Sequence, residues 1–220
     1  TALLAKADLE TQMVGEFSEL QGVMGREYAL LEGENPVVAQ AVYEHYLPTA
    51  AGGELPQTEE GAIVGIADKI DTITGFFGVG LPPTGTADPY ALRRQALGVI
   101  NIILAKRYQL PLDFLVEESL KLLEGSLKKP AADIKNDILE FFSGRYQNQL
   151  IAQGYAYDTV EAVLAAGLTD LVAAAEKIKA LQAFRNDPEF EPVSVAFKRV
   201  DNILKDFRNP KIDERLLTTA

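Results

Sequence analysis

Asp8, His45 and Asp68 are residues whose types could bind a metal ion or transfer a proton. Asp71 lies three residues after Asp68 and would share its face of a helix. Two carboxylates on one face can bind a hard cation such as Mg²⁺ or Mn²⁺, although a solvated helix face is the more common origin of this spacing. Because Asp68 follows the apolar run "AIVGIA", we expect it to be partly buried and to need a partner.

His45 is the only histidine, and the sequence contains no cysteine. Within this sequence, these counts exclude disulfides, thiolate ligands, a cysteine nucleophile and a zinc site built from several histidines. His45 lies late in the segment "VYEHYLP", where an imidazole commonly only bonds the last carbonyls of a helix. The position of His45 therefore indicates a structural role rather than a catalytic one.

Positive charge is sparse, because 21 Lys and Arg stand against 32 Asp and Glu, a net charge of −11 at pH 7. This balance argues against a broad basic field for nucleic acid but permits a local basic face. Arg93 and Arg94 would point about 100° apart on a helix. One could contact RNA or an acidic partner surface while the other pairs with a nearby carboxylate or the preceding loop. In "AFKRVDNILKDF", Lys198, Arg199 and Lys205 lie largely off an apolar stripe, as an RNA-binding helix would place them.

Nearly every periodic segment indicates a helix, so the sequence predicts an all-α fold. The apolar stripe of residues 2–17 predicts the first helix. Pro36 suits the first turn of a helix over 36–48, and Thr58 is a candidate N-cap for a helix that continues to residue 77. Asp88 is the N-cap candidate of the next helix, with a proline at its first position.

The second half of the chain predicts a helical array. The segment 124–133 is the best linker candidate, and helices are expected over 110–123, 133–154, 157–167, 168–184 and 193–207. Three tyrosines in this half could stack on unpaired bases, although core or surface positions are more common for Tyr146, Tyr155 and Tyr157. The opening residues lack the pattern of a secretory leader, and we interpret the chain as a piece of a longer protein.

The order of the first segments resembles the HD superfamily of metal-dependent phosphohydrolases, on "KADLETQMV", "PVVAQAVYEHYLP" and "GAIVGIADKIDTITGFFG". In that family a histidine, a His-Asp dyad and a later aspartate bind divalent metal. The resemblance matches Asp8 to the dyad aspartate, Asp68 to the late aspartate and His45 to an extra histidine of some members. Ala7 stands where the dyad histidine would be, so the resemblance implies degenerate positions at which no metal is expected.

A more extensive resemblance covers nearly the whole chain. The segments "KADLETQMVGEFSELQGVMGREYALLEGE", "ADKIDTITGFFGVGLPPTGTADPYALRRQALGVINI" and "AFKRVDNILKD" resemble the β subunit of bacterial tetrameric glycyl-tRNA synthetase. This resemblance implies a degenerate HD-like helical domain over 1–110 and a connecting helix and linker over 111–132. A helical domain of the anticodon-binding type would occupy 133–220 and be incomplete at its C-terminus.

The same resemblance implies a function within an aminoacyl-tRNA synthetase, a ligase. The fragment would have no catalytic residues and no cofactor of its own, and it would support tRNA(Gly) binding and subunit assembly. ATP and Mg would be used on the α subunit, which with tRNA(Gly) would be the partner. The resemblance implies no DNA or membrane partner, a cytoplasmic location, and tRNA-binding candidates Arg93, Arg94, Lys198, Arg199 and Lys205.

Two alternatives stay open at this point. Asp8, His45 and Asp68 could serve an HD-type metal-dependent phosphohydrolase. The chain could also be a protein-interaction scaffold that presents its acidic surface and the glycine-proline loop "GVGLPPTG" to a partner.

Overall fold

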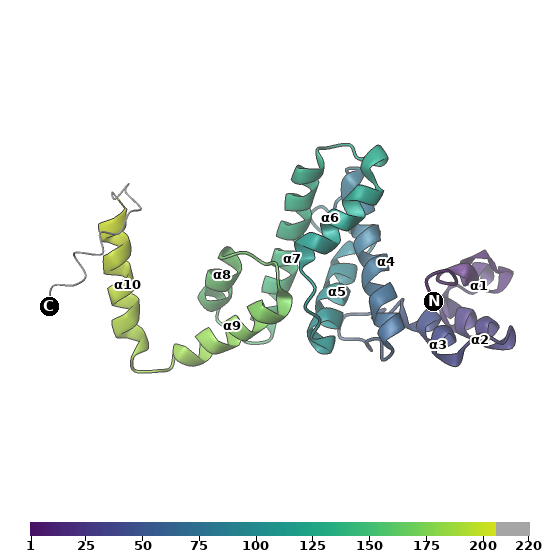
Figure 1. Cartoon of the computed structure of the whole chain (residues 1–220), viewed down its shortest axis with the longest axis horizontal. Coiled ribbons are helices and arrows are strands. Elements are labelled where there is room, and N and C mark those ends of the chain that lie inside the picture. The colour runs from purple at the N-terminus through teal and green to yellow at the C-terminus, as the bar shows by residue number, and fades with distance from the viewer. Residues whose placement is uncertain (206–220) are drawn as a thin grey trace, which may run out of the picture. The chain divides into compact units, whose positions relative to one another are not determined.

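The computed structural model describes residues 1–205 and is helical throughout (Figure 1). Ten α-helices and three short 3₁₀ helices form over these residues, with no β-strand among them, which confirms the predicted all-α class. The chain divides into two compact units, residues 1–178 and 179–220. No described helix combines the length and the hydropathy that a membrane span requires.

Unit 1 begins with three short helices, α1 (Gln12–Glu16), α2 (Val23–Leu31) and α3 (Pro36–Glu44). Pro36 occupies the first turn of α3, as predicted, and the Asn35 side chain accepts a hydrogen bond from the backbone N–H of Val37. Helices α2 and α3 pack together closely, because a Cβ atom on Gly25 would lie 2.8 Å from Cγ1 of Val42. A glycine is therefore required where these two helices meet.

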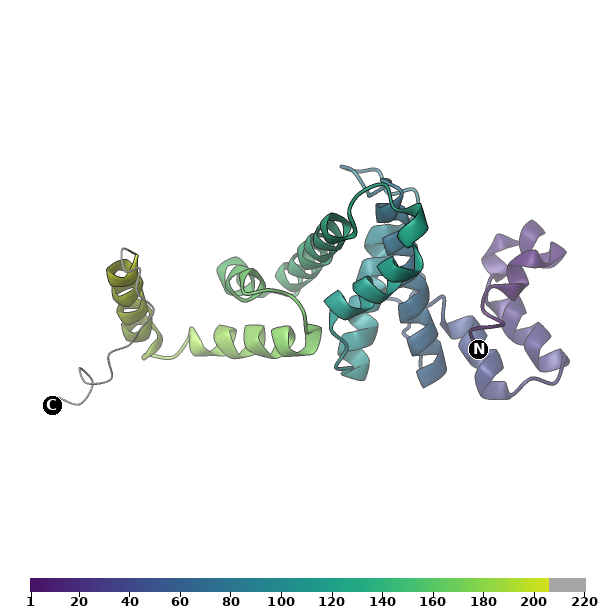
Figure 2. The ribbon, with the colours of Figure 1, turned by 45° about the horizontal axis from the view of Figure 1, so that its top comes forward.

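The rest of unit 1 is built around two long helices, α4 (Glu59–Gly78) and α5 (Leu92–Lys106), which run side by side (Figures 1 and 2). Their shared core contains Ile66, Ile73, Val99 and Ile103, all less than 5% exposed. The core continues into α6 (Leu112–Leu122), α7 (Ala131–Ala152), α8 (Tyr157–Ala165) and the start of α9 (Leu171–Phe184).

The core of unit 1 is not interrupted between residues 111 and 132. Helix α6 packs against both α4 and α7, and the backbone N–H of Lys128 donates to the carbonyl of Gly78 at the end of α4. The compact units therefore do not follow the ranges 1–110, 111–132 and 133–220. The assignment of those ranges to particular domain families stays a prediction.

The close contact between α3 and α4 positions the candidate site. A Cβ atom on Gly61 would lie 2.7 Å from Cβ of Glu44, and one on Gly65 would lie 3.1 Å from the backbone oxygen of His45. Thr58 caps α4 as predicted, because its Oγ1 accepts from the N–H of Gly61. The same threonine donates to the buried carboxylate of Glu44, so the cap of α4 is bonded directly to the end of α3.

The predicted helix over residues 2–17 is wrong. The chain instead forms turns, a 3₁₀ helix over Ala7–Glu10 and the short α1, with Lys6 in the left-handed region at φ 67°. The break follows from two polar side chains: Asp8 is turned inward and 2% exposed, and Thr11 caps α1 by accepting from the N–H of Val14. Local polar contacts therefore override the apolar periodicity.

The predicted start of α5 is also wrong, by a few residues. Asp88 and Pro89 lie outside the helix, which begins at Leu92 after Ala91 adopts a left-handed conformation at φ 55°. The Asp88 carboxylate still accepts from the N–H groups of Leu92 and Arg93, at 2.8 and 2.9 Å. It thus satisfies first-turn donors from a position before the usual N-cap.

Unit 2 contains the amphipathic helix α10 (Phe190–Leu204), whose predicted last residues 206–207 lie outside the described part of the chain. Its apolar stripe is not buried in the described residues, since Phe197 and Ile203 are 72% and 74% exposed. The sequence predicted an apolar stripe with cations largely off it, and the described helix confirms this amphipathic pattern.

The α3–α4 contact leads to a first prediction on two glycines of one helix. Gly61→Ala places a methyl group against Glu44 and Thr58, and we expect it to lower the free energy of unfolding by about 1–3 kcal/mol. Gly75→Ala is the control, because no atom lies within 4 Å of the position that its new methyl group would take.

The control substitution should raise the free energy of unfolding by roughly 0.5–1 kcal/mol, through lower backbone entropy in the unfolded chain. Urea denaturation of both variants measures the difference. Equal effects of the two substitutions would contradict a close α3–α4 contact at Gly61.

Candidate functional site

Asp8 acts as a helix cap. Its Oδ2 accepts from the backbone N–H of Gly22 at 2.5 Å, where α2 begins, and its Oδ1 accepts from the Tyr46 hydroxyl at 3.2 Å. A carboxylate at this point neutralises the orphan donors and the positive end of the α2 dipole. Burial raises the pKa of the Tyr46 hydroxyl to about 12, so this hydroxyl stays protonated and donates a hydrogen bond to Asp8.

His45 is fully buried at the end of α3. Its Nδ1 lies 2.6 Å from the carbonyl oxygen of Val42, which matches the expectation that this imidazole bonds a helix-end carbonyl. Its Nε2 has no hydrogen-bond partner among the described residues, and the ring lies against that of Tyr46, with 3.9 Å between the ring centroids. Burial lowers the pKa of His45, which favours a neutral imidazole at pH 7.

Asp68 on α4 is partly buried and forms an ion pair with Lys6, as the apolar run before it predicted. Asp71 is exposed. Asp8 is thus engaged by Gly22 and Tyr46, and Asp68 by Lys6. Among the described residues no group of three or more His, Cys, Asp or Glu side chains could hold a metal ion. The interpretation of these positions as degenerate stays a prediction.

Lys69 is the most unusual residue of this region, because its side chain is only 4% exposed. Its Nζ donates to the carbonyl oxygen of His45 at 2.8 Å and to that of Gly65 at 3.4 Å. The ammonium therefore satisfies a carbonyl at the C-terminal end of α3, where a cation also opposes the helix dipole. Burial lowers the pKa of Lys69 from 10.5 to about 8, although the nearby carboxylate of Asp68 acts in the opposite direction.

A cavity of about 610 Å³ lies beside these residues. Its cationic lining residues are Lys6, Lys69 and Arg94, and its acidic ones are Asp68 and Glu19. We call it the Lys69 cavity. Its other lining residues are largely polar: Ser18, Gln21, Tyr46, Thr49, Thr72 and Gln95, with Leu9 and Pro48 as apolar members.

The two adjacent arginines have different environments. Arg93 donates to the carbonyl oxygens of Gly85 at 2.6 Å and Ala87 at 3.5 Å, so it holds the loop before α5. Arg94 is exposed and lines the Lys69 cavity. The contact of Arg93 with the preceding loop confirms one part of the predicted division, and contact of Arg94 with RNA or a partner surface stays a prediction.

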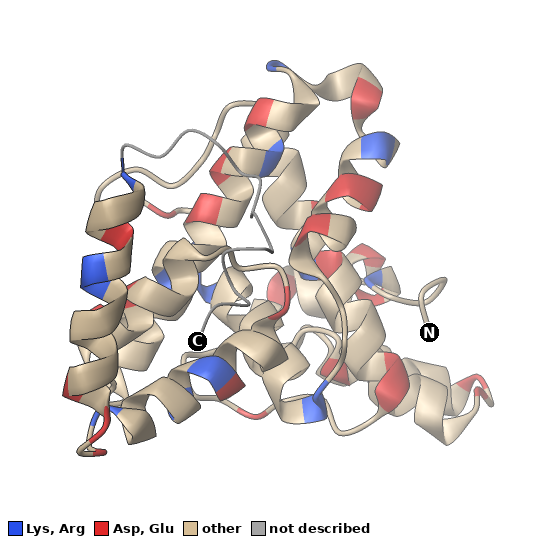
Figure 3. Ribbon diagram, turned by 60° about the vertical axis from the view of Figure 1, so that its left-hand side comes forward, with Lys and Arg blue, Asp and Glu red and all other residues tan. Residues whose placement is uncertain are grey.

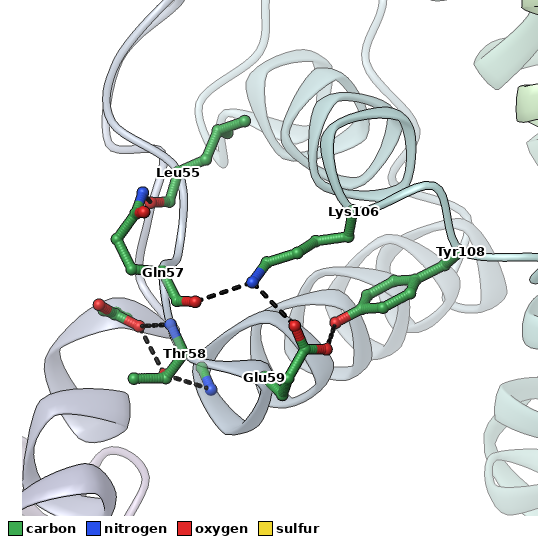
Figure 4. A network of polar contacts seen from close by, with 8 residues as sticks. Leu55, Gln57, Thr58, Glu59, Lys106 and Tyr108 are labelled. Carbon is green, nitrogen blue, oxygen red and sulfur yellow. Dashed lines mark hydrogen bonds and ion pairs between the residues drawn. The ribbon is translucent and has the colours of Figure 1, made fainter.

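A polar network fixes α5 against the start of α4 (Figure 4). Lys106 donates to the carbonyl of Gln57 at 2.8 Å and to the Glu59 carboxylate at 3.0 Å, and the Tyr108 hydroxyl donates to the same carboxylate. Burial and this contact with Glu59 raise the pKa of Tyr108 to about 12. The network joins the end of α5 to the start of α4, the two helices that also carry Arg94 and Lys69.

The predicted RNA-contacting cations of α10 are all exposed. Lys198 and Arg199 lie on α10, and Lys205 follows its last residue. The Nζ atom of Lys205 lies 3.0 Å from Oδ1 of Asn202 and 3.9 Å from a carboxylate oxygen of Asp201. Acidic residues are spread over many helices, with basic residues interspersed among them along the ribbon (Figure 3). These positions are compatible with RNA contact, which stays a prediction.

The three tyrosines considered for stacking on bases differ in exposure. Tyr146 is 1% exposed and belongs to the core, so it cannot stack on a base. Tyr155 is partly buried against the core of unit 1, and Tyr157 is 57% exposed.

Sequence reasoning missed Lys69 and Lys6 as members of this site. Lys69 lies on the buried side of α4, three residues after Ile66 and four before Ile73. A lysine in such an apolar stripe is a signal, because lysine is rarely buried without a partner. Lys6 gave no comparable signal, since its contact with Asp68 depends on the unexpected turn of the N-terminal segment.

The family described as Glycyl-tRNA synthetase beta subunit matches residues 1–165. The chain is 66% identical over 220 residues to the glycine–tRNA ligase beta subunit of Syntrophus aciditrophicus. It is 59% identical over 219 residues to that of Geobacter metallireducens. Each alignment covers 100% of this chain and 32% of the relative, so the chain spans about one third of the length of these curated relatives.

The lowered pKa of Lys69 leads to a prediction on stability and pH. Between pH 8 and 10.5 the unfolded chain keeps a proton on this lysine that the folded chain has lost. The free energy of unfolding should therefore rise with pH in this window, by up to about 3 kcal/mol through Lys69. Lys69→Met removes this contribution.

Denaturation of both proteins at pH 7, 8, 9 and 10 measures the difference between their free energies of unfolding. That difference should grow in favour of the wild type as the pH rises. Parallel pH profiles would contradict a buried lysine with a lowered pKa.

Proposed function

Because the chain belongs to the glycyl-tRNA synthetase beta subunit family, we propose that it is a part of a β subunit that supports tRNA binding and subunit assembly. In this proposal the parent enzyme joins glycine to tRNA(Gly) in the cytoplasm, and the α subunit carries the site that uses ATP and Mg. The described unit 1 is a scaffold and the cationic face of α10 approaches tRNA. The proposal rests on the family match over residues 1–165 and on the similarity of the whole chain to the curated β subunits.

The engagement of the HD-like carboxylates supports a scaffold role for unit 1. Asp8 accepts two hydrogen bonds from protein donors, and Asp68 is paired with Lys6. Metal coordination would have to replace these contacts and leave a buried backbone N–H at Gly22 without its acceptor, which is costly. These contacts support a scaffold role for unit 1 over metal-assisted hydrolysis.

A metal titration tests the phosphohydrolase alternative. We expect no stoichiometric binding of Mn²⁺ by calorimetry and no turnover of a phosphodiester panel. Tight binding together with turnover that Asp68→Asn abolishes would overturn the scaffold proposal in favour of the hydrolase. The same substitution should otherwise cost little stability, since the Lys6–Asp68 pair is partly exposed and such pairs contribute about 0–1 kcal/mol.

Substitution of the exposed cations of α10 tests the proposed contact with tRNA. In the full-length β subunit assembled with α, the double change Lys198→Ala and Arg199→Ala should weaken tRNA binding. It should also reduce the slope of log affinity against log salt by about 1 for each lost phosphate contact. Lys121→Ala with Lys129→Ala is the matched control, because it removes the same charge from exposed side chains of unit 1.

Fluorescence anisotropy with labelled tRNA at several salt concentrations measures both quantities. A double α10 variant that binds as the wild type does, at every salt concentration, would overturn the assignment of tRNA contact to α10.

A further inference from the structure

We propose that the Lys69 cavity is a binding site for a phosphate group, held mainly by Lys69 and Arg94. The cavity has the volume of an ordinary small-ligand site, about 610 Å³, and three cations line it. The occupant is the phosphate of an RNA strand or of a free nucleotide, which present the same chemistry to the site. The inference does not depend on the proposed tRNA contact of α10.

The first argument is the environment of the Lys69 ammonium. It is buried, yet its hydrogen-bond acceptors are two neutral carbonyls, and among the described residues no carboxylate lies within ion-pair distance of it. An ammonium has three donors, so at least one N–H is left for another acceptor. A buried charge that contacts no counter-ion is costly, and an anion in the adjoining cavity would compensate it.

The second argument is that Arg94 reaches the same cavity with its donors uncommitted. The described residues provide no hydrogen bond or ion pair to its guanidinium, which can bind a phosphate through two parallel N–H donors. Arg94 lies one helical turn before Gly98, where a Cβ atom would be 3.2 Å from Cε of Lys69. The glycine therefore leaves room for the lysine stem between α4 and α5 and keeps both cations at one cavity.

The third argument concerns the carboxylates at the cavity. Asp68 is already paired with Lys6, and Glu19 is exposed at the cavity wall, where water screens its charge. Lys69 is therefore the one buried charge among the lining residues, and no carboxylate pairs with it or with Arg94 among the described residues. Ser18 and Thr49 are also lining residues, and serine and threonine hydroxyls can donate to further oxygens of a tetrahedral anion such as phosphate.

Adjacent arginines provide a matched test. Binding of inorganic phosphate and pyrophosphate to the 220-residue chain is measured by calorimetry for the wild type, Arg94→Gln and Arg93→Gln. We expect saturable binding that Arg94→Gln weakens about tenfold or more, as the loss of a charged hydrogen bond predicts. Arg93→Gln removes the same charge, but Arg93 bonds the loop before α5 and does not line the cavity. The phosphate affinity of this variant should therefore stay within about twofold of the wild type.

Lys69→Met is the second variant, and it should also weaken phosphate binding. Because Lys69 bonds the end of α3, the folding of the Lys69→Met variant is checked by circular dichroism. If this variant does not fold, the Arg94→Gln variant alone tests whether the cavity binds phosphate. Equal weakening by Arg94→Gln and Arg93→Gln would overturn the proposal, as would the lack of saturable anion binding by the wild type.

Two further ligands distinguish the source of the phosphate. Binding of a short single-stranded RNA that depends on Arg94, and that inorganic phosphate displaces, would assign a phosphodiester. Tighter binding of a nucleoside monophosphate than of the RNA, with the same dependence on Arg94, would assign a free nucleotide. Both outcomes support a phosphate site, and binding of either ligand that is indifferent to Arg94→Gln contradicts it.

Discussion

The described architecture of unit 1 depends on how closely α3 approaches α4. Gly61 and Gly65 lie one turn apart on α4 and leave no room for a side chain against Glu44 and His45. Lys69, one further turn along, donates to the carbonyl that α3 presents there. The two glycines thus allow close packing of α3 against α4, and the Lys69 side chain bonds the two helices together. This contact also positions the segment after α3, which lines the Lys69 cavity.

The positions that resemble a metal centre have structural roles in this chain. Asp8 caps α2, His45 bonds the carbonyl of Val42, and Asp68 pairs with Lys6. A carboxylate next to an apolar surface needs a cation or several donors, whichever function it serves. The Lys6 ammonium supplies this positive charge for Asp68.

The sequence predicted those features that arise from local chemistry. The helical class, the Thr58 cap and the first-turn position of Pro36 follow from residues within one turn of each other. The errors lie where distant contacts decide the backbone: Asp8 breaks the N-terminal helix by bonding Gly22, and the left-handed Ala91 delays α5. The pairing of Lys6 with Asp68 spans 62 residues of sequence, and periodicity carries no information on such contacts.

The two adjacent arginines show how one turn of α5 can both bond the preceding loop and line the Lys69 cavity. Consecutive side chains diverge by about 100°, so Arg93 can hold the loop while Arg94 faces the Lys69 cavity. The loop is bonded to Arg93, and α5 is bonded to the start of α4 through Lys106 and Glu59. Arg94 and Lys69 line the cavity from α5 and α4, which pack against each other. A ligand there meets one cation that is already held, since Lys69 is bonded to the carbonyls of His45 and Gly65. The exposed Arg94 side chain is ordered only when the ligand binds, at an entropic cost.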